Sequence, residues 1–154
     1  NHNHDLSRAL ASIEAAAEAG VDAVKFQTYT ADTITIDSDL EPFQVKGGTL
    51  WDGRTLYDLY SEAFTPWEWH EQLFEHATQQ GLIALSTPFD PTAIELLESL
   101  DAPVYKVASM EIVDTPLIGL IASKGKPVII STGIATEEEI GLPSMPATQS
   151  TTTR

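Results

Sequence analysis

Two lysines interrupt apolar segments that have the character of β-strands. Lys25 lies within 23–27, and Lys106 lies within 104–109. Lysine is almost never fully buried unless it is paired, and strand alternation puts Lys25 and Gln27 on one face. Two such lysines in one cavity would form a positive pocket for a small anion such as a phosphate or a carboxylate. Alternatively, the two lysines form salt bridges with nearby acids or extend their ammonium groups to a solvated rim.

Hydroxyl side chains follow the predicted strands at their carboxyl ends. Thr87, Ser109 and Ser131 each stand at the end of an apolar run. Hydroxyl donors at this end of a barrel are well placed to bind phosphate oxygens, although each could equally cap the helix that follows it. Glu111, just beyond the strand that ends at Ser109, is a candidate acid/base or an acceptor for sugar hydroxyls, and otherwise a solvated loop acid.

The histidines carry weaker signals. His2 and His4 form an H-x-H pair that could chelate a metal, but two ligands without a third are little evidence for a site. His70 and His76 are six residues apart on a predicted helix, so they do not share a face. We interpret both as structural or exposed.

The three tryptophans could form a stacking platform for a sugar, although such residues more often serve in packing. They are Trp51, Trp67 and Trp69. The position of Trp67 in a predicted helix cap favours packing for that residue.

Composition excludes several classes of function. The 154 residues include 23 Asp and Glu but only 8 Lys and Arg, which gives a net charge of −15. A surface this acidic repels phosphate backbones and anionic lipid, so neither nucleic acid nor a membrane is an expected partner. There is no cysteine, which excludes disulfides and thiolate chemistry. We expect a cytoplasmic location.

Apolar periodicity alternates between helix and strand along the chain. Strands are predicted at 23–27, 82–86, 104–109 and 128–131, and helices at 6–17, 65–80, 90–100 and 115–125, with a new helix start at 136–139. The last three strands recur at short intervals, which indicates βα units and a parallel sheet. Short apolar strands ending in polar residues favour a (β/α)8 barrel over a doubly wound sheet, because no Gly-rich phosphate loop follows any strand.

A complete barrel needs about 250 residues, so the four predicted strands would form only part of one. We therefore expect an α/β fold with a partial TIM-barrel domain over residues 1–140. The segment 141–154 is rich in Pro, Ser and Thr, and we expect this tail to be disordered.

Several long motifs resemble the sialic acid synthase family. They are NHNHDL, AGVDAVKFQTYTADT, LSTPFD, VYKVASMEI and KGKPVIISTGIAT, in this order over residues 1–140. The block from WDGRTLY to PWEWH is most similar to the pseudaminic acid synthase branch. The resemblance implies a TIM barrel, here about strands 2–5, which is followed in the family by an antifreeze-like domain and is usually dimeric.

The resemblance also implies a reaction. Family members condense phosphoenolpyruvate with an N-acetylated amino sugar to give a nonulosonic acid and phosphate, with a divalent metal, typically Mn²⁺, polarising the sugar aldehyde. By motif, the phosphoenolpyruvate-binding positions are Lys25, Gln27, Thr87, Lys106, Ser109 and Ser131. Glu111 matches the acid that contacts the sugar, and Lys25, Lys106 and Glu111 are the expected catalytic residues.

Several family features have no counterpart in this sequence. The first barrel strand, the later strands with the metal-binding histidines and the antifreeze-like domain are missing, so we expect a truncated or frame-shifted product that is inactive alone and holds no metal ligands. Two alternatives stay open. One is a Schiff-base aldolase that uses Lys106 and would be trapped by borohydride. The other is a non-catalytic module completed by a second chain.

Overall fold

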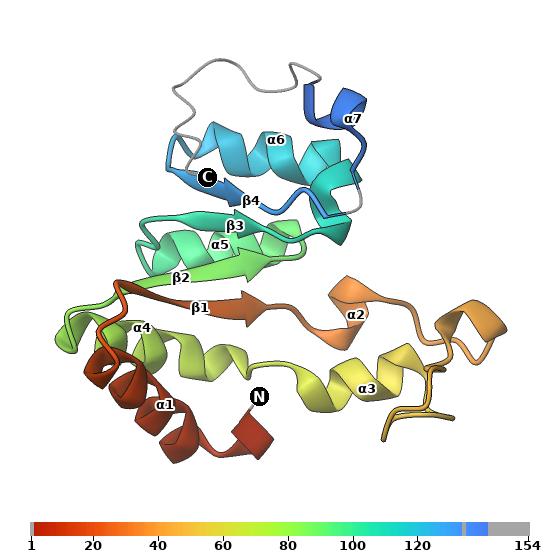
Figure 1. Ribbon diagram of the computed structural model, residues 1–154, viewed down its shortest axis with the longest axis horizontal. Helices are drawn as coiled ribbons and strands as arrows, with labels where there is room; N and C mark the ends of the chain where they lie inside the picture. Colours follow the sequence, from red (N-terminus) through yellow and green to blue (C-terminus); the bar gives the residue numbers. More distant parts are fainter. Residues whose placement is uncertain (1, 134, 142–154) are drawn as a thin grey trace.

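Four parallel strands form one sheet in the computed structural model, which describes residues 2–133 and 135–141 (Figure 1). In chain order they are β1 (Ala23–Thr28), β2 (Ile83–Pro88), β3 (Tyr105–Val107) and β4 (Val128–Ile130). Their spatial order is also β1-β2-β3-β4. Apart from residue 141, the tail for which we expect disorder lies outside the described residues.

The strand order distinguishes the two candidate architectures. A doubly wound sheet reverses its strand order at a switch point, whereas a barrel adds each new strand beside the last. Here each strand pairs in parallel with the next one along the chain. The arrangement is therefore that of a contiguous part of a (β/α)8 barrel, as the sequence predicts.

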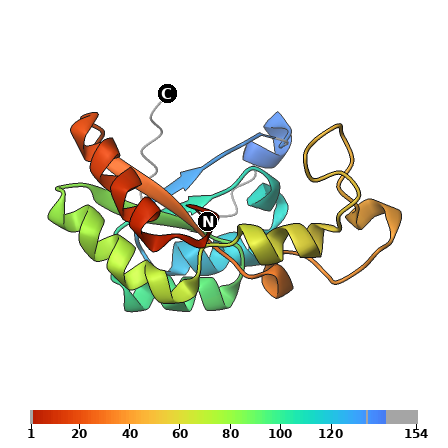
Figure 2. The same ribbon diagram turned by 90° about the horizontal axis from the view of Figure 1, so that it is seen from below.

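Helices cover one face of the sheet, as Figure 2 shows. They are α4 (His70–Gln79), α5 (Pro91–Ser99) and α6 (Thr115–Ser123), while α1 (Leu6–Glu18) packs against α4 beside β1. The core between helices and sheet includes Leu73, Ile94, Tyr105 and Ile121, each fully buried. On the other face, Ile83 and Ile129 remain 48% and 50% exposed.

Aspartate caps position two of these helices. Asp90 accepts hydrogen bonds from the backbone N–H groups of Thr92 and Ala93, and Asp114 accepts one from that of Leu117. Each aspartate is followed by a proline in the first turn, where the missing N–H costs nothing. The helix start predicted at 136–139 also forms, because Thr136 and Glu139 hydrogen-bond reciprocally at the start of α7 (Glu137–Gly141).

The long segment after β1 contains more regular structure than its polar composition indicates. It holds α2 (Ala31–Ile34), a 3₁₀ turn η2 (Glu41–Phe43), a bridge between Gln44 and Thr55, and α3 (Leu56–Ala63). Helix α3 is not predicted from the sequence, although Thr55 caps it by accepting a hydrogen bond from the backbone N–H of Asp58.

The next helix begins later than predicted. Residues Trp67–Trp69 form a 3₁₀ turn, η3, and the α-helix starts only at His70. Thr65, where the helix is predicted to begin, does not cap it, because Pro66 occupies the N-cap position of the turn and offers no side-chain hydrogen bond. The remaining short turns are η1 (His2–His4) and η4 (Met110–Val113).

Candidate functional site

The register of the sheet brings the two strand lysines to the same face. Gln27 of β1 pairs with Thr87 of β2. Because Ser86 of β2 pairs with Tyr105 of β3, the next residues on these two parallel strands, Thr87 and Lys106, also lie side by side. Lys25 lies two residues before Gln27 on β1 and therefore shares its face. This is the face without covering helices, on which Lys25 and Gln27 are exposed.

Lys106 is held by two oxygens at the end of the sheet. Its Nζ donates hydrogen bonds of 2.8 Å to Ser131 Oγ and 3.2 Å to the carbonyl oxygen of Val107. Ser131 follows β4 directly, so the contact spans two adjacent strands. Because Ser131 Oγ accepts from the ammonium, its own proton is available for another acceptor.

Lys25 and Lys106 interact electrostatically. Partial burial, followed by the positive charge of Lys106, lowers the pKa of Lys25 below that of an ordinary lysine. No side-chain hydrogen bond or ion pair is observed for Lys25 among the described residues. Two ammonium groups that repel each other on one open face form a site that a small anion would stabilise.

Glu111 lies beside this cationic pair in η4, just past β3. Its Oε2 is buried and has no hydrogen-bond partner among the described residues. Burial is the largest effect and raises the pKa of Glu111. The charge of Asp114 raises it further, whereas a hydrogen bond from its own backbone N–H and the charge of Lys106 lower it. The carboxyl group is thus shifted toward the protonated form and can act as a proton donor or bind a polar ligand.

Ser109 is confined by the backbone after β4. A Cβ atom at Gly133 would lie 2.6 Å from Ser109 Oγ and 2.7 Å from Ser109 Cβ. Only glycine therefore lets the 131–133 segment approach the end of β3 this closely. The approach brings Ser109 and Ser131 to the same end of the sheet.

All seven residues singled out from the sequence lie on this open face or at the carboxyl ends of β2, β3 and β4. They are Lys25, Gln27, Thr87, Lys106, Ser109, Glu111 and Ser131. Thr87 is the most enclosed, at 1% exposure. Their roles in binding and catalysis stay predictions.

A buried polar chain on the opposite face was not predicted. Thr28 Oγ1 lies 2.9 Å from His70 Nε2 and 2.7 Å from Ser86 Oγ, and all three residues are fully buried. His70 Nδ1 lies 3.2 Å from the carbonyl oxygen of Pro66, which can only accept. Nδ1 therefore carries the proton, Thr28 donates to Nε2, and Ser86 donates to Thr28. His70 is structural, one of the two alternatives that the sequence left open.

The other histidines contact separate elements. His76 Nε2 lies 3.1 Å from Glu14 on α1, and His4 Nε2 lies 2.7 Å from the carbonyl oxygen of Glu62. Within residues 2–133 and 135–141, no three His, Cys, Asp or Glu side chains are grouped so that they could hold a metal ion.

The tryptophans fall into two groups. Trp67 donates from Nε1 to the carbonyl oxygen of Tyr29, and Trp69 packs against the core. These contacts are structural. Trp51 is 40% exposed and lies on the loop before α3.

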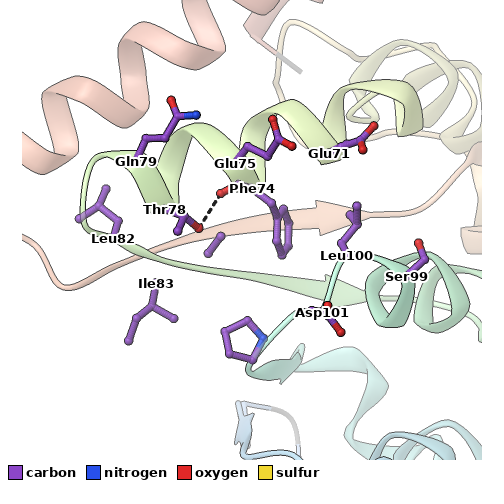
Figure 3. A pocket seen from close by; sticks show the side chains of 12 residues that line it. Glu71, Phe74, Glu75, Thr78, Gln79, Leu82, Ile83, Ser99, Leu100 and Asp101 are labelled. Carbon is purple, nitrogen blue, oxygen red and sulfur yellow. Dashed lines mark hydrogen bonds between the residues drawn. The ribbon is translucent and has the colours of Figure 1, made fainter.

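A large hollow lies away from the lysines, between α4 and α5 (Figure 3). It has a volume of about 730 Å³ and is lined by apolar Phe74, Leu82 and Leu100 with Glu75 and Asp101 at its rim. It opens beside the start of β2, whereas barrel enzymes place their chemistry at the carboxyl ends of the strands. We therefore do not assign the anion site to it.

The described part of the chain contains no helix that is both long and apolar enough to cross a bilayer.

Comparisons with known proteins agree with the fold. Residues 12–149 match the NeuB family. The chain is 53% identical over 140 residues to a pseudaminic acid synthase of Campylobacter jejuni, covering 91% of this chain and 40% of that protein. It is 51% identical to a pseudaminic acid synthase of Helicobacter pylori, with 91% and 41% covered. The chain thus spans about two fifths of the length of these relatives.

Solved structures give the same result. The crystal structure of an N-acetylneuraminic acid synthetase from Leptospira borgpetersenii, in complex with citrate, matches with a TM-score of 0.73 at 29% identity. The match covers 91% of this chain and 44% of that one. A spore coat polysaccharide biosynthesis protein from Bacillus subtilis matches with a TM-score of 0.68 at 34% identity, covering 91% and 36%. The expectation of a partial barrel is thereby confirmed.

Proposed function

This chain belongs to the NeuB family, and from that premise we propose that it supplies the phosphoenolpyruvate-binding half of a nonulosonic acid synthase, of the pseudaminic acid branch. The observation that carries the proposal is the shared open face of Lys25 and Lys106, with Ser131 bonded to Lys106. A cationic pair with hydroxyl donors suits a ligand that carries both a phosphate and a carboxylate.

The proposed roles follow from the chemistry of the side chains. Lys25 and Lys106 bind the anionic groups of phosphoenolpyruvate, and Thr87, Ser109 and Ser131 donate hydrogen bonds to them, with Gln27 at the margin. As the methylene carbon bonds to the sugar aldehyde and water attacks the resulting cationic centre, the C–O bond to phosphate breaks. The fixed positive charges stabilise the departing phosphate.

Glu111 completes the proposed arrangement on the sugar side. Because its pKa is raised and its Oε2 has no hydrogen-bond partner among the described residues, Glu111 can accept a hydrogen bond from the amino sugar or donate one to it. The proposal also includes the Mn²⁺ that the family implies, pairing into a homodimer, a domain boundary at residue 140 and a cytoplasmic location. We expect the 154-residue chain alone to bind but not to turn over.

Calorimetric titration of the chain with phosphoenolpyruvate tests the proposal. Lys25→Met and Lys106→Met should each weaken binding by about tenfold or more, because each removes one charge-assisted contact. Lys46→Met is the matched control, since Lys46 forms an exposed ion pair with Glu41 away from the sheet. No binding to the unaltered chain, or equal binding by all three variants, would contradict the proposal.

Borohydride treatment in the presence of pyruvate separates this proposal from a Schiff-base aldolase. The proposed synthase forms no imine, so no covalent adduct at Lys106 is expected. Adduct formation there by mass spectrometry would favour the aldolase instead.

A further inference from the structure

The carboxyl ends of β1 and β2 are joined by side chains as well as by the strand ladder. Phe26 pairs with Ser86 in the parallel register, so Ser86 and Thr28, the last residue of β1, project to the helix-covered face. There Thr28 Oγ1 lies 2.7 Å from Ser86 Oγ. Gln27 and Thr87 also pair, and their side chains project to the opposite face. Each hydroxyl of this link is therefore one position away from a residue of the candidate site.

The η3 turn and the start of α4 hold the same end of β1 from the helix layer. His70, the first residue of α4, lies 2.9 Å through its Nε2 from Thr28 Oγ1. Trp67 in η3 donates from Nε1 to the carbonyl oxygen of Tyr29 at 3.1 Å. Two side chains from one short segment thus hold two consecutive residues at the end of β1. The imidazole is itself held at its other nitrogen, because Nδ1 lies 3.2 Å from the carbonyl oxygen of Pro66.

The chain of hydrogen bonds runs in one direction, and Thr28 is the hydroxyl at its centre. With the Nδ1 proton of His70 directed at a carbonyl oxygen, Nε2 accepts from Thr28. Thr28 in turn accepts from Ser86, whose hydroxyl has no other hydrogen-bond partner in the part of the chain that the structure describes. Without the Thr28 hydroxyl, both His70 and Ser86 would have an unpaired polar atom in the interior.

Holding the two strands together does not require a buried polar chain. The ladder between β1 and β2 already spans six residue pairs, and apolar side chains would fill the same space without the cost of removing hydroxyl and imidazole groups from water. What the hydrogen bonds add is direction, because they fix the positions of the bonded atoms relative to one another. Those fixed points lie directly behind Gln27 and Thr87, and Thr87 is itself only 1% exposed.

We propose that Thr28 is a positioning residue for the anion site. Through its links to Ser86 and His70 it holds the carboxyl ends of β1 and β2 at a fixed separation. Gln27 and Thr87, each one residue away on the opposite face, are thereby fixed where they meet the ligand. This inference rests on the proposed function, because the ligand is the phosphoenolpyruvate that the strand lysines bind.

Calorimetric titration with phosphoenolpyruvate tests this role, under conditions in which urea denaturation shows that every variant is folded. Thr28→Val keeps the shape of the side chain but removes the hydroxyl, and it should weaken binding by about three- to tenfold. Thr28→Ser keeps the hydroxyl and should bind within about twofold of the unaltered chain. Ser86→Ala breaks the link between the strands and should resemble Thr28→Val. Thr78→Val is the matched control, because the Thr78 hydroxyl bonds to the Phe74 carbonyl oxygen of its own helix.

The methyl resonance of Thr87, assigned through Thr87→Ser, reports the same geometry without a ligand. It should shift in Thr28→Val and Ser86→Ala but stay nearly unchanged in Thr28→Ser and Thr78→Val. A residue that only stabilises the fold would change the urea midpoint without moving this resonance or the affinity of the folded protein.

A double-mutant cycle tests whether Thr28 acts through Thr87. Thr87→Val should weaken phosphoenolpyruvate binding less in the Thr28→Val protein than in the unaltered chain, because Thr87 is already displaced there. Additive effects would contradict the positioning role, and so would unchanged affinity in folded Thr28→Val. Neither result would affect the proposed function. No binding by the unaltered chain would instead overturn the proposed function, and the Thr87 resonance would then decide by itself whether Thr28 positions that residue.

Discussion

The ammonium group of Lys106 donates a 2.8 Å hydrogen bond to Ser131 Oγ across the end of the sheet. This contact fixes a long, flexible side chain at one position before any ligand arrives. It also orients the serine hydroxyl, because an oxygen that accepts from an ammonium directs its own proton elsewhere. One contact thus prepares two donors for the same anion.

Removing the serine hydroxyl should weaken anion binding without abolishing it. In Ser131→Ala, Lys106 keeps its charge and its bond to the Val107 carbonyl oxygen but loses the 2.8 Å contact. We expect phosphoenolpyruvate to bind about three- to tenfold more weakly by calorimetry, which corresponds to the roughly 1 kcal/mol that an ordinary hydrogen bond contributes. Ser123→Ala on α6 is the control, since that exposed hydroxyl bonds only to its own helix at Leu120. Equal affinities for both variants would contradict this role.

Replacing Gly133 should disturb Ser109. A Cβ in Gly133→Ala would lie 2.6 Å from Ser109 Oγ, so the segment after β4 or the end of β3 must move. Overpacking of this kind costs about 1–3 kcal/mol of unfolding free energy, measurable by urea denaturation, and anion affinity should fall with it. Gly119→Ala on α6 is the opposite case, because nothing lies within 4 Å of its added Cβ. That variant should gain about 0.5–1 kcal/mol.

As the pH is raised, anion binding should weaken at a lower pH than it would if Lys25 had an ordinary lysine pKa. Burial and the charge of Lys106 lower the pKa of Lys25, so Lys25 loses its proton at a lower pH than usual and then no longer attracts an anion. Lys25→Arg keeps its charge to much higher pH, so its affinity should fall less over the same alkaline range. Titrations of phosphoenolpyruvate at a series of pH values compare the two proteins, and parallel profiles would contradict the assignment to Lys25.

The fold could largely be predicted from sequence because its signals are local and consistent. The Asp90-Pro91 and Thr115-Pro116 pairs each mark the start of a helix that forms there, and each strand is a short apolar run. The candidate site could be proposed from the sequence because Lys25 and Lys106 interrupt the apolar pattern around them. Which face they share depends only on strand alternation once the pairing is known.

The rest depends on contacts between distant residues. Helix α3 is short, and what holds it is the packing of Tyr60 on Tyr29 and the contact of Glu62 with His4, neither of which leaves a local signal. The Thr55 cap could have indicated its start. The chain from Ser86 through Thr28 to His70 joins residues up to 58 positions apart. Single-residue polarity could not indicate that this histidine is buried.

The buried histidine should make stability depend on pH. Burial lowers the pKa of His70 below the ordinary histidine value of 6.5, and its backbone hydrogen bonds only partly oppose this effect. Below pH 6.5 the unfolded chain therefore binds a proton that the folded chain excludes, so stability falls as the pH drops from 6.5 through the folded-state pKa. Urea denaturation at about pH 7.5 and pH 5.5 measures this loss of stability. The loss should be smaller in His70→Gln, which lacks the buried histidine. The other three histidines are common to both proteins and contribute equally to each. His70→Gln should also be less stable than the parent at pH 7.5 by about 1–3 kcal/mol, since the Thr28 hydroxyl loses its acceptor. An unchanged difference between the two pH values in the variant would show that His70 is not the group responsible.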